Sequence, residues 1–308
     1  MEILTNAALT EDELAAARAV LTAAAEADGR EAVSEAGRLR LRVAEPRAGV
    51  THLVQRGEAR EPAGYAQLEV GEGTATVEFA VHPELRRRGH GRALLDAVLA
   101  AAGPGRAVDF WAHGGHPGAA RLAEERGAEL VRELRQMRKP AEPVPAAPVL
   151  PAGVTVRTFR PGRDEAAWLA LNALAFAHHP EQGSWTERDL ADRQAEAWFD
   201  PSGFFLAVRG DGDGAERVVG FHWTKVHPDG LGEVYVVGVD PAEQGNGLGK
   251  ALTATGLRHL AEDRKAPTVL LYVDADNHAA VRVYEGQGFT VHEVDLMYRL
   301  HTEQAPRA

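Results

Sequence analysis

Hydrophobic and polar positions follow the same order in the two halves of the chain. In the first half, strand-type and helix-type runs alternate in a way that predicts helices near 10–25 and 34–41, strands near 51–55, 64–70 and 74–81, a helix near 90–101, a strand at 107–111, a helix near 117–126 and a strand at 130–137. The second half predicts a strand near 154–159, helices near 163–176 and 186–197, strands near 203–208, 217–225 and 233–239, a helix near 248–262, a strand at 268–273, a helix near 277–286 and a strand at 289–300. This order indicates a mixed α/β sheet in each half, and not a uniform βαβ array.

A proline-rich segment separates the halves. It contains Pro140, Pro143, Pro145, Pro148 and Pro151. Proline has no backbone N–H and favours extended polyproline II, which makes a semi-rigid spacer. We therefore predict an N-terminal domain at 1–139, a linker at 140–151 and a C-terminal domain at 152–308.

A glycine-rich turn occupies the same place in each half. It is Arg86-Arg87-Arg88-Gly89-His90-Gly91 in the first and Gln244-Gly245-Asn246-Gly247-Leu248-Gly249 in the second. Each turn follows a predicted strand and a proline, and each opens a predicted helix. Glycines let the backbone approach an anion closely, and the amides of a first helical turn have no partner within the helix. A strand, such a turn and a helix together predict a phosphate site. The spacing fits neither a P-loop nor the dinucleotide-binding turn.

Composition narrows the class of protein. The chain has 308 residues, 44% hydrophobic residues, no cysteine and a net charge of −11. This acidic balance disfavours nucleic acid or an anionic membrane as a partner, and the lack of cysteine excludes disulfides and thiolate metal sites. No stretch has the length of a membrane span, and Met1 to Asp12 lack the features of a secretory signal. A cytoplasmic enzyme is the expectation.

The turns give both halves a resemblance to GCN5-related N-acetyltransferases (GNATs). In that family an Arg/Gln-x-x-Gly-x-Gly/Ala loop binds the pyrophosphate of acetyl-CoA, and an Asn and a Tyr on a later helix belong to the same site. Asn277 and Tyr284 stand at matching places in the second half. The resemblance implies two tandem acetyltransferase domains.

The two copies differ in residues that can transfer protons. With Val81 set against Val239, Glu233 falls opposite Ala75; with Gly127 set against Gly288, Tyr284 falls opposite Ala123. A base must deprotonate the attacking amine, and an acid can protonate the departing thiolate. We therefore predict that only the second half is catalytic, with Glu233 as base and Tyr284 as acid. A backbone N–H near Val237 to Val239 is expected to stabilise the oxyanion.

Longer segments resemble the mycothiol synthases. They include His178 to Gly183, Gly220 to Pro228 and Gly232 to Pro241 in the second half, and Phe110 to Gly114 in the first. The resemblance implies transfer of acetyl from acetyl-CoA to the cysteinyl amine of 1D-myo-inositol 2-(L-cysteinylamino)-2-deoxy-α-D-glucopyranoside, a thiol-containing pseudodisaccharide, giving mycothiol and CoA.

The same resemblance implies the binding residues. For the acceptor they are Glu35, Glu181, Lys225, Glu233 and Tyr272. For acetyl-CoA in the first half they are Phe79, Ala80, Val81, Arg87, Arg88, Gly89, His90, Gly91 and Arg92. For acetyl-CoA in the second half they are Val237, Gly238, Val239, Gln244, Gly245, Asn246, Gly247, Leu248, Gly249, Lys250, Asn277, His278, Ala279, Ala280, Val281 and Arg282.

Other interpretations stay open. The chain could acetylate another small amine or a protein N-terminus, or it could be an acetyl-CoA sensor without turnover. His178, His179, His222 and His227 do not have the spacing of a metal site, so no metal is expected, and His222 is expected to line the strand face or the acceptor cleft. Because an internal repeat can stand in for a dimer, we expect a monomer.

Overall fold

The computed structural model describes residues 1–41, 46–71, 73–179, 182–210 and 216–302. These form two compact units: the N-terminal unit, Met1–Arg135 with Asp274–Asp276 and Glu293–Ala308, and the C-terminal unit, Gln136–Val273 with Asn277–His292. The expected boundaries at 139 and 152 differ from these limits, because the last strand of each half is divided between the units.

The N-terminal unit has a sheet with the strand order β1-β2-β3-β4-β5-β12. Its strands are β1 (Glu2–Asn6), β2 (Val50–Arg56), β3 (Pro62–Val70), β4 (Thr74–Val81), β5 (Ala107–Ala112) and part of β12 (Thr290–His301), and its helices are α1 (Glu11–Asp28), α2 (Glu35–Arg40), α3 (His90–Ala102) and α4 (Pro117–Arg126). Only the β4–β5 pairing is parallel among those described in this unit. The start of β6 (Glu129–Pro140) also belongs here.

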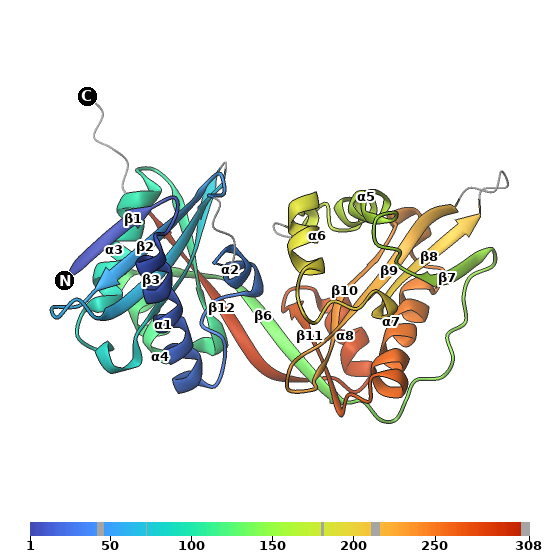
Figure 1. The fold of residues 1–308 in the computed structure, drawn as a ribbon. Coiled ribbons are helices and arrows are strands. Elements are labelled where there is room, and N and C mark those ends of the chain that lie inside the picture. The colour runs from blue at the N-terminus through green and yellow to red at the C-terminus, as the bar shows by residue number, and fades with distance from the viewer. Residues whose placement is uncertain (42–45, 72, 180–181, 211–215, 303–308) are drawn as a thin grey trace. The chain divides into compact units, whose positions relative to one another are not determined.

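The two faces of this sheet carry different helices. Leu94, Leu95 and Val98 of α3 join a core with Ala66 and Val77 on one face. On the other face α1 lies along β3 (Figure 1), and its residues join a core with Tyr65 of β3. A capping box opens α1: the Thr10 side chain accepts from the Glu13 amide, and the Glu13 carboxylate accepts from the Thr10 amide.

The C-terminal unit repeats the plan, with the strand order β6-β11-β10-β9-β8-β7. Its strands are the end of β6, β7 (Val154–Thr158), β8 (Phe204–Gly210), β9 (Glu216–Val226), β10 (Gly232–Val239), β11 (Thr268–Asp274) and the first residues of β12, and its helices are α5 (Glu165–Ala175), α6 (Glu187–Gln194), α7 (Leu248–Arg258), which continues as a π-helical turn (His259–Asp263), and α8 (His278–Gly286).

One face of this sheet packs under α5 and α6, in an aromatic core that includes Trp168, Phe221 and Trp223. The other face packs under α7 and α8, in cores that include Leu252, Val234 and Val281. The tandem mixed α/β architecture predicted from the sequence is confirmed.

Among the described residues, no helix combines the length and apolar character that crossing a membrane requires.

Candidate functional site

Both glycine-rich turns adopt the conformation that an anion site needs. Gly89 and Gly247, the residues that precede α3 and α7, each have a φ of +88°, and neither has a side chain that could cap its helix. A Cβ added at either glycine would meet nothing within 4 Å. Glycine is required there by backbone conformation, and the amides of a first helical turn have no partner within the helix.

The turns match residue for residue. Arg87 has a φ of +63° at the position where the second copy has Gly245, with a φ of +80°. The N-terminal turn thus accepts a strained, non-glycine residue in order to present a guanidinium beside the amides. In the C-terminal turn the Asn246 side chain accepts a hydrogen bond from the Leu248 amide at 3.1 Å, which leaves the next amides of the helix for an anion.

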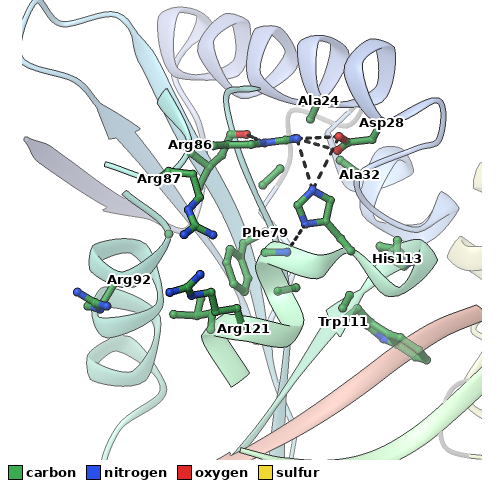
Figure 2. A pocket seen from close by; sticks show the side chains of 18 of the residues that line it. Ala24, Asp28, Ala32, Phe79, Arg86, Arg87, Arg92, Trp111, His113 and Arg121 are labelled. Atoms are coloured by element: carbon green, nitrogen blue, oxygen red, sulfur yellow. Dashed lines mark hydrogen bonds and ion pairs between the residues drawn. The ribbon is translucent and has the colours of Figure 1, made fainter. Parts of the chain in front are cut away.

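A pocket of about 360 Å³ lies beside the N-terminal turn. Figure 2 shows Arg87, Arg92 and Arg121 on one side of it and Trp111 and His113 on the other. Seven of the residues assigned to acetyl-CoA in this half line it: Phe79, Ala80, Val81, Arg87, Gly89, Gly91 and Arg92. Arg88 and His90 are not among its lining residues, and the His90 side chain is buried. Arg92 and Arg121 both pair with Glu125, which also lines the pocket, so the three arginines leave a net positive charge, which fits a polyphosphate ligand.

An ion pair fixes the approach to this turn. Arg86 donates two hydrogen bonds to Asp28 at the end of α1, at 2.7 and 2.8 Å, and a third to the Val81 carbonyl. The Arg86 hydrogen bond lowers the pKa of the Asp28 carboxyl. Arg86 therefore anchors the turn to α1 (Figure 2).

Sequence reasoning missed a cluster of charged residues around His113, which lines the same pocket. His113 contacts Glu78 of β4 through Nε2 at 2.9 Å and Asp295 of β12 through Nδ1 at 3.2 Å. Hydrogen bonds to both carboxylates outweigh burial and raise the pKa of His113 to about 10. Glu78 also accepts from the amide and hydroxyl of Ser34. A charged residue within an apolar strand was the available signal; Asp295 is too distant in sequence to be linked to it.

In the C-terminal unit, Glu233 lies on β10 with 5% of the residue exposed. It is paired with Lys225 on β9 and with Leu270 on β11. Paired side chains share a face of a sheet, and so do residues two apart. Lys225 and Tyr272 therefore lie on the same face as Glu233, the one that α5 and α6 cover. The structure brings these three predicted residues together.

A bulge in β10 changes the comparison of the two copies. The pairing of β10 with β9 skips Tyr235 between Val234 and Val236, whereas β4 pairs with β3 without a shift. When the two strands are aligned backwards from Val81 and Val239 and the extra residue is left out, Glu233 corresponds to Thr76. The expected match of Glu233 with Ala75 is therefore wrong by one position. Threonine is no general base, so the asymmetry between the copies remains.

Tyr284 lies on the other face, on α8, where it packs against the core of Val234, Leu271 and Val281. Burial raises the pKa of its hydroxyl, which keeps the phenol protonated at neutral pH. The match with Ala123 is correct: the Phe289 amide donates to the Tyr284 carbonyl as the Ala128 amide donates to that of Ala123.

Toward its C-terminal end, β10 separates from its neighbouring strand β11. Their pairing runs only from Gly232–Val269 to Val234–Leu271. Val237, Gly238 and Val239 continue to pair with β9. Backbone groups on the β11 side of this segment are therefore available beside the turn that opens α7, as an oxyanion donor requires.

Comparison with known proteins identifies the family. Two models match: the Acetyltransferase (GNAT) family over residues 168–289 and an Acetyltransferase (GNAT) domain over residues 48–131. The mycothiol acetyltransferase of Streptomyces coelicolor is 57% identical, with 97% of this chain and 96% of that protein covered. That of Streptomyces bingchenggensis is 59% identical, over 91% and 90%. This chain belongs to the mycothiol acetyltransferase family.

Solved structures agree with the fold of this mycothiol acetyltransferase family member. A GCN5-related N-acetyltransferase from Sphaerobacter thermophilus has a TM-score of 0.67 at 27% identity and covers 99% of this chain and 98% of its own. A tandem GNAT protein from the clavulanic acid biosynthesis pathway has a TM-score of 0.72 at 20% identity, over 100% and 99%, and supports the fold alone.

The residues that the resemblance assigns to the acceptor do not all belong to one unit. Glu35 opens α2 in the N-terminal unit, whereas Lys225, Glu233 and Tyr272 are in the C-terminal unit. Glu181 lies outside the described residues. Tyr272 is 44% exposed and accepts a hydrogen bond from Gln136 at 2.8 Å.

Lys225 is held by aromatic rings. Its Nζ lies 4.5 Å from the ring centre of Trp198 and 5.1 Å from that of Tyr235. A cation over two ring faces is stabilised and held in one orientation beside Glu233.

Of the residues assigned to acetyl-CoA after the turn, Asn277 has a structural role as well. It precedes α8, and its side chain accepts from the Ala280 amide at 3.1 Å. His116 caps α4 in the same way. The rest of this set occupies the first turns of the two helices: Leu248, Gly249 and Lys250 on α7, and His278, Ala279, Ala280, Val281 and Arg282 on α8.

Of the two places expected for His222, the structure supports the strand face and contradicts the acceptor cleft. The ring is fully buried, and Nδ1 contacts the Leu252 carbonyl of α7 at 2.7 Å. Burial lowers its pKa to about 4, so it is a neutral core residue and lines no cleft. Within the described ranges, no group of three or more metal-ligating side chains is placed to hold a metal ion.

Proposed function

We propose that this chain transfers acetyl from acetyl-CoA to the cysteinyl amine of 1D-myo-inositol 2-(L-cysteinylamino)-2-deoxy-α-D-glucopyranoside, giving mycothiol and CoA. The observation that carries the proposal is the identity of 57% across nearly the whole length of a protein named mycothiol acetyltransferase. The site described above fits this chemistry in its charges and its exposed amides.

In the C-terminal unit, the pyrophosphate of acetyl-CoA binds the turn from Gln244 to Lys250, and the pantetheine arm enters where β10 separates from β11. This proposal is supported by the open amides at the start of α7 and by the short β10–β11 pairing. Asn277 to Arg282 complete the site from α8.

In the transfer step, we assign the base and the acid to residues on opposite faces of the C-terminal sheet. The acceptor amine loses its proton to Glu233 and attacks the thioester carbon. A backbone N–H near Val237 to Val239 stabilises the oxyanion. When the tetrahedral intermediate collapses, the C–S bond breaks and Tyr284 gives its proton to the CoA thiolate. Burial of Tyr284 supports its role as the acid, since the phenol enters the cycle protonated.

On the acceptor side, Lys225 and Tyr272 donate to sugar and inositol oxygens, and Glu35 and Glu181 add carboxylates for hydroxyls or the ammonium group. The shared face of Lys225, Tyr272 and Glu233 supports this assignment for the first two.

The N-terminal unit binds a second acetyl-CoA and does not transfer its acetyl group. The pocket and its arginines support binding in this unit. The absence of transfer is supported by Thr76 and Ala123, which stand where the other copy has Glu233 and Tyr284. We also propose that the protein is a monomer, because two copies of the fold in one chain supply what a dimer would. Light scattering of the purified protein tests its oligomeric state. We further propose that it is cytoplasmic and uses no metal.

Mass spectrometry of the product tests the reaction. The purified chain is incubated with acetyl-CoA and the cysteinyl pseudodisaccharide, with Glu233→Gln as the matched control. One acetyl group on the cysteinyl nitrogen, formed by the wild type and not by the variant, is the expected result. Consumption of acetyl-CoA only with other amines or with peptide N-termini would favour the alternative acetyltransferase, and binding without turnover would favour a sensor.

A further inference from the structure

A histidine outside the assigned site holds the carboxylate of Glu233. The Nε2 atom of His227 lies 2.6 Å from Oε2 of Glu233. Within the described residues, the other oxygen of Glu233, Oε1, has no hydrogen bond. The two carboxylate oxygens are therefore different: one is held, and one is open.

The backbone fixes where His227 can reach. It follows β9 in the hairpin that leads to β10, where its amide donates to the Leu231 carbonyl at 2.8 Å and its carbonyl accepts from the Gly230 amide at 2.9 Å. Gly230 turns the chain with a φ of +87°. His227 is also two residues beyond Lys225, which places it on the face of Glu233. The hairpin therefore places the His227 ring beside the carboxylate of Glu233.

The chemistry of the contact assigns the proton. An ionised carboxylate is only an acceptor, so a short contact to Nε2 requires that Nε2 carries hydrogen and donates. Glu233 is buried, whereas the His227 side chain is 27% exposed. Lys225, the other charged group facing Glu233 from β9, is held over aromatic rings.

We infer that His227 is a positioning residue for the general base: its Nε2–H holds Oε2, so that Oε1 is the atom that takes the proton from the acceptor amine. As the C–N bond forms, that proton moves from the amine nitrogen to Oε1, Nε2 keeps its hydrogen, and the carboxylic acid returns the proton to water after the product leaves. This rests on the proposed function. The ordinary alternative is that the pair only stabilises the hairpin.

Three variants distinguish a positioning role of His227 from a role in hairpin stability alone. His227→Gln keeps an N–H donor at a similar reach, His227→Phe keeps a ring without a donor, and His227→Ala removes both. We expect His227→Gln to keep most of the wild-type kcat, and the other two to lose about 10- to 100-fold in kcat with KM for acetyl-CoA unchanged. Thermal melting and acetyl-CoA titration verify that each variant is folded.

Two results would overturn the inference: wild-type kcat in His227→Phe, or an equal loss in His227→Gln and His227→Phe. If His227→Ala does not fold, the Gln and Phe pair decides alone. Failure of the wild type to acetylate the pseudodisaccharide would refute the proposed function instead, so the two failures are distinct.

Discussion

The proposed acid and base have opposite surroundings. Glu233 has a histidine donor and a lysine beside it, whereas the hydroxyl of Tyr284 lies against hydrocarbon and, within the described residues, has no hydrogen-bond partner. A carboxylate needs donors to stay ionised when buried, and a phenol in an apolar setting keeps its proton. Each residue thus enters the reaction in the state that its role requires.

Tyr284→Phe removes the proposed acid and little else. Because the hydroxyl makes no hydrogen bond to the part of the chain that the structure describes, we expect an unchanged or slightly raised melting temperature, with kcat lower by about 100-fold. Steady-state kinetics and thermal melting measure both. Full activity in this variant would remove Tyr284 from the mechanism.

Glu233→Gln keeps an oxygen that can accept from His227, so the hairpin is preserved while the base is lost. We expect kcat to fall by about 100-fold or more and the melting temperature to change little. A variant that unfolds would instead indicate that the carboxylate is needed for stability, and unchanged kinetics would show that another group is the base.

Lys225→Met keeps the stem packed on Trp198 and Tyr235 but removes the charge. We expect KM for the pseudodisaccharide to rise by about 10-fold, because a charge-assisted hydrogen bond to the acceptor is lost, while KM for acetyl-CoA stays the same. An increase in both constants would mean that Lys225 organises the donor site as well.

At the scale of elements, nearly every strand and helix follows from the periodicity of the sequence, because each has one apolar face toward a core. The strand β1 does not: Glu2–Asn6 carries no alternating apolar pattern. The bulge at Tyr235 was also missed. Both Tyr235 and Val236 contribute to the core under α5 and α6, so apolar character alone gives no sign of the extra residue.

Some residues of the candidate site could likewise be predicted from the sequence, and others could not. Residues carried by a local motif, such as the turn at 244–249, were predictable because consecutive residues form the site. His113 was not, because a strand from the far end of the sequence brings Asp295 to it. His227 is only six residues from Glu233, but the sequence does not show that the hairpin turns the two side chains toward each other.

The His113 cluster joins α2, β4, the end of β5 and β12, and it gives a pH dependence. The pKa of His113 is about 10, above its ordinary value near 6.5. Its contribution to stability is therefore complete below about pH 6.5 and is lost as pH rises toward 10. We expect the melting temperature of the wild type to exceed that of His113→Gln by the largest margin at pH 6.5, and by a shrinking margin at higher pH. A constant margin would contradict the charged state of His113.

At the scale of the whole molecule, the two turns can be separated by matched variants. Gly91 and Gly249 occupy the second position of α3 and α7, and a Cβ at each meets only a valine methyl at 3.7 Å. A glutamate there suits the start of a helix but repels phosphate.

We expect Gly249→Glu to abolish turnover and leave one acetyl-CoA site per chain, and Gly91→Glu to keep turnover and also leave one site. Calorimetry with acetyl-CoA counts the sites, and the wild type should bind two. Loss of turnover in Gly91→Glu with normal turnover in Gly249→Glu would reverse the proposed division of labour.

The last strand has a consequence for biosynthesis. Leu296 to His301 pair with β5, so the N-terminal unit takes its sixth strand from the end of the chain. While the ribosome is still translating, that strand does not yet exist, and the β5 edge stays open with unpaired amides and carbonyls. The nascent polypeptide therefore passes through a stage at which this edge could recruit a neighbouring chain, and the pairing of β12 with β5 ends that stage.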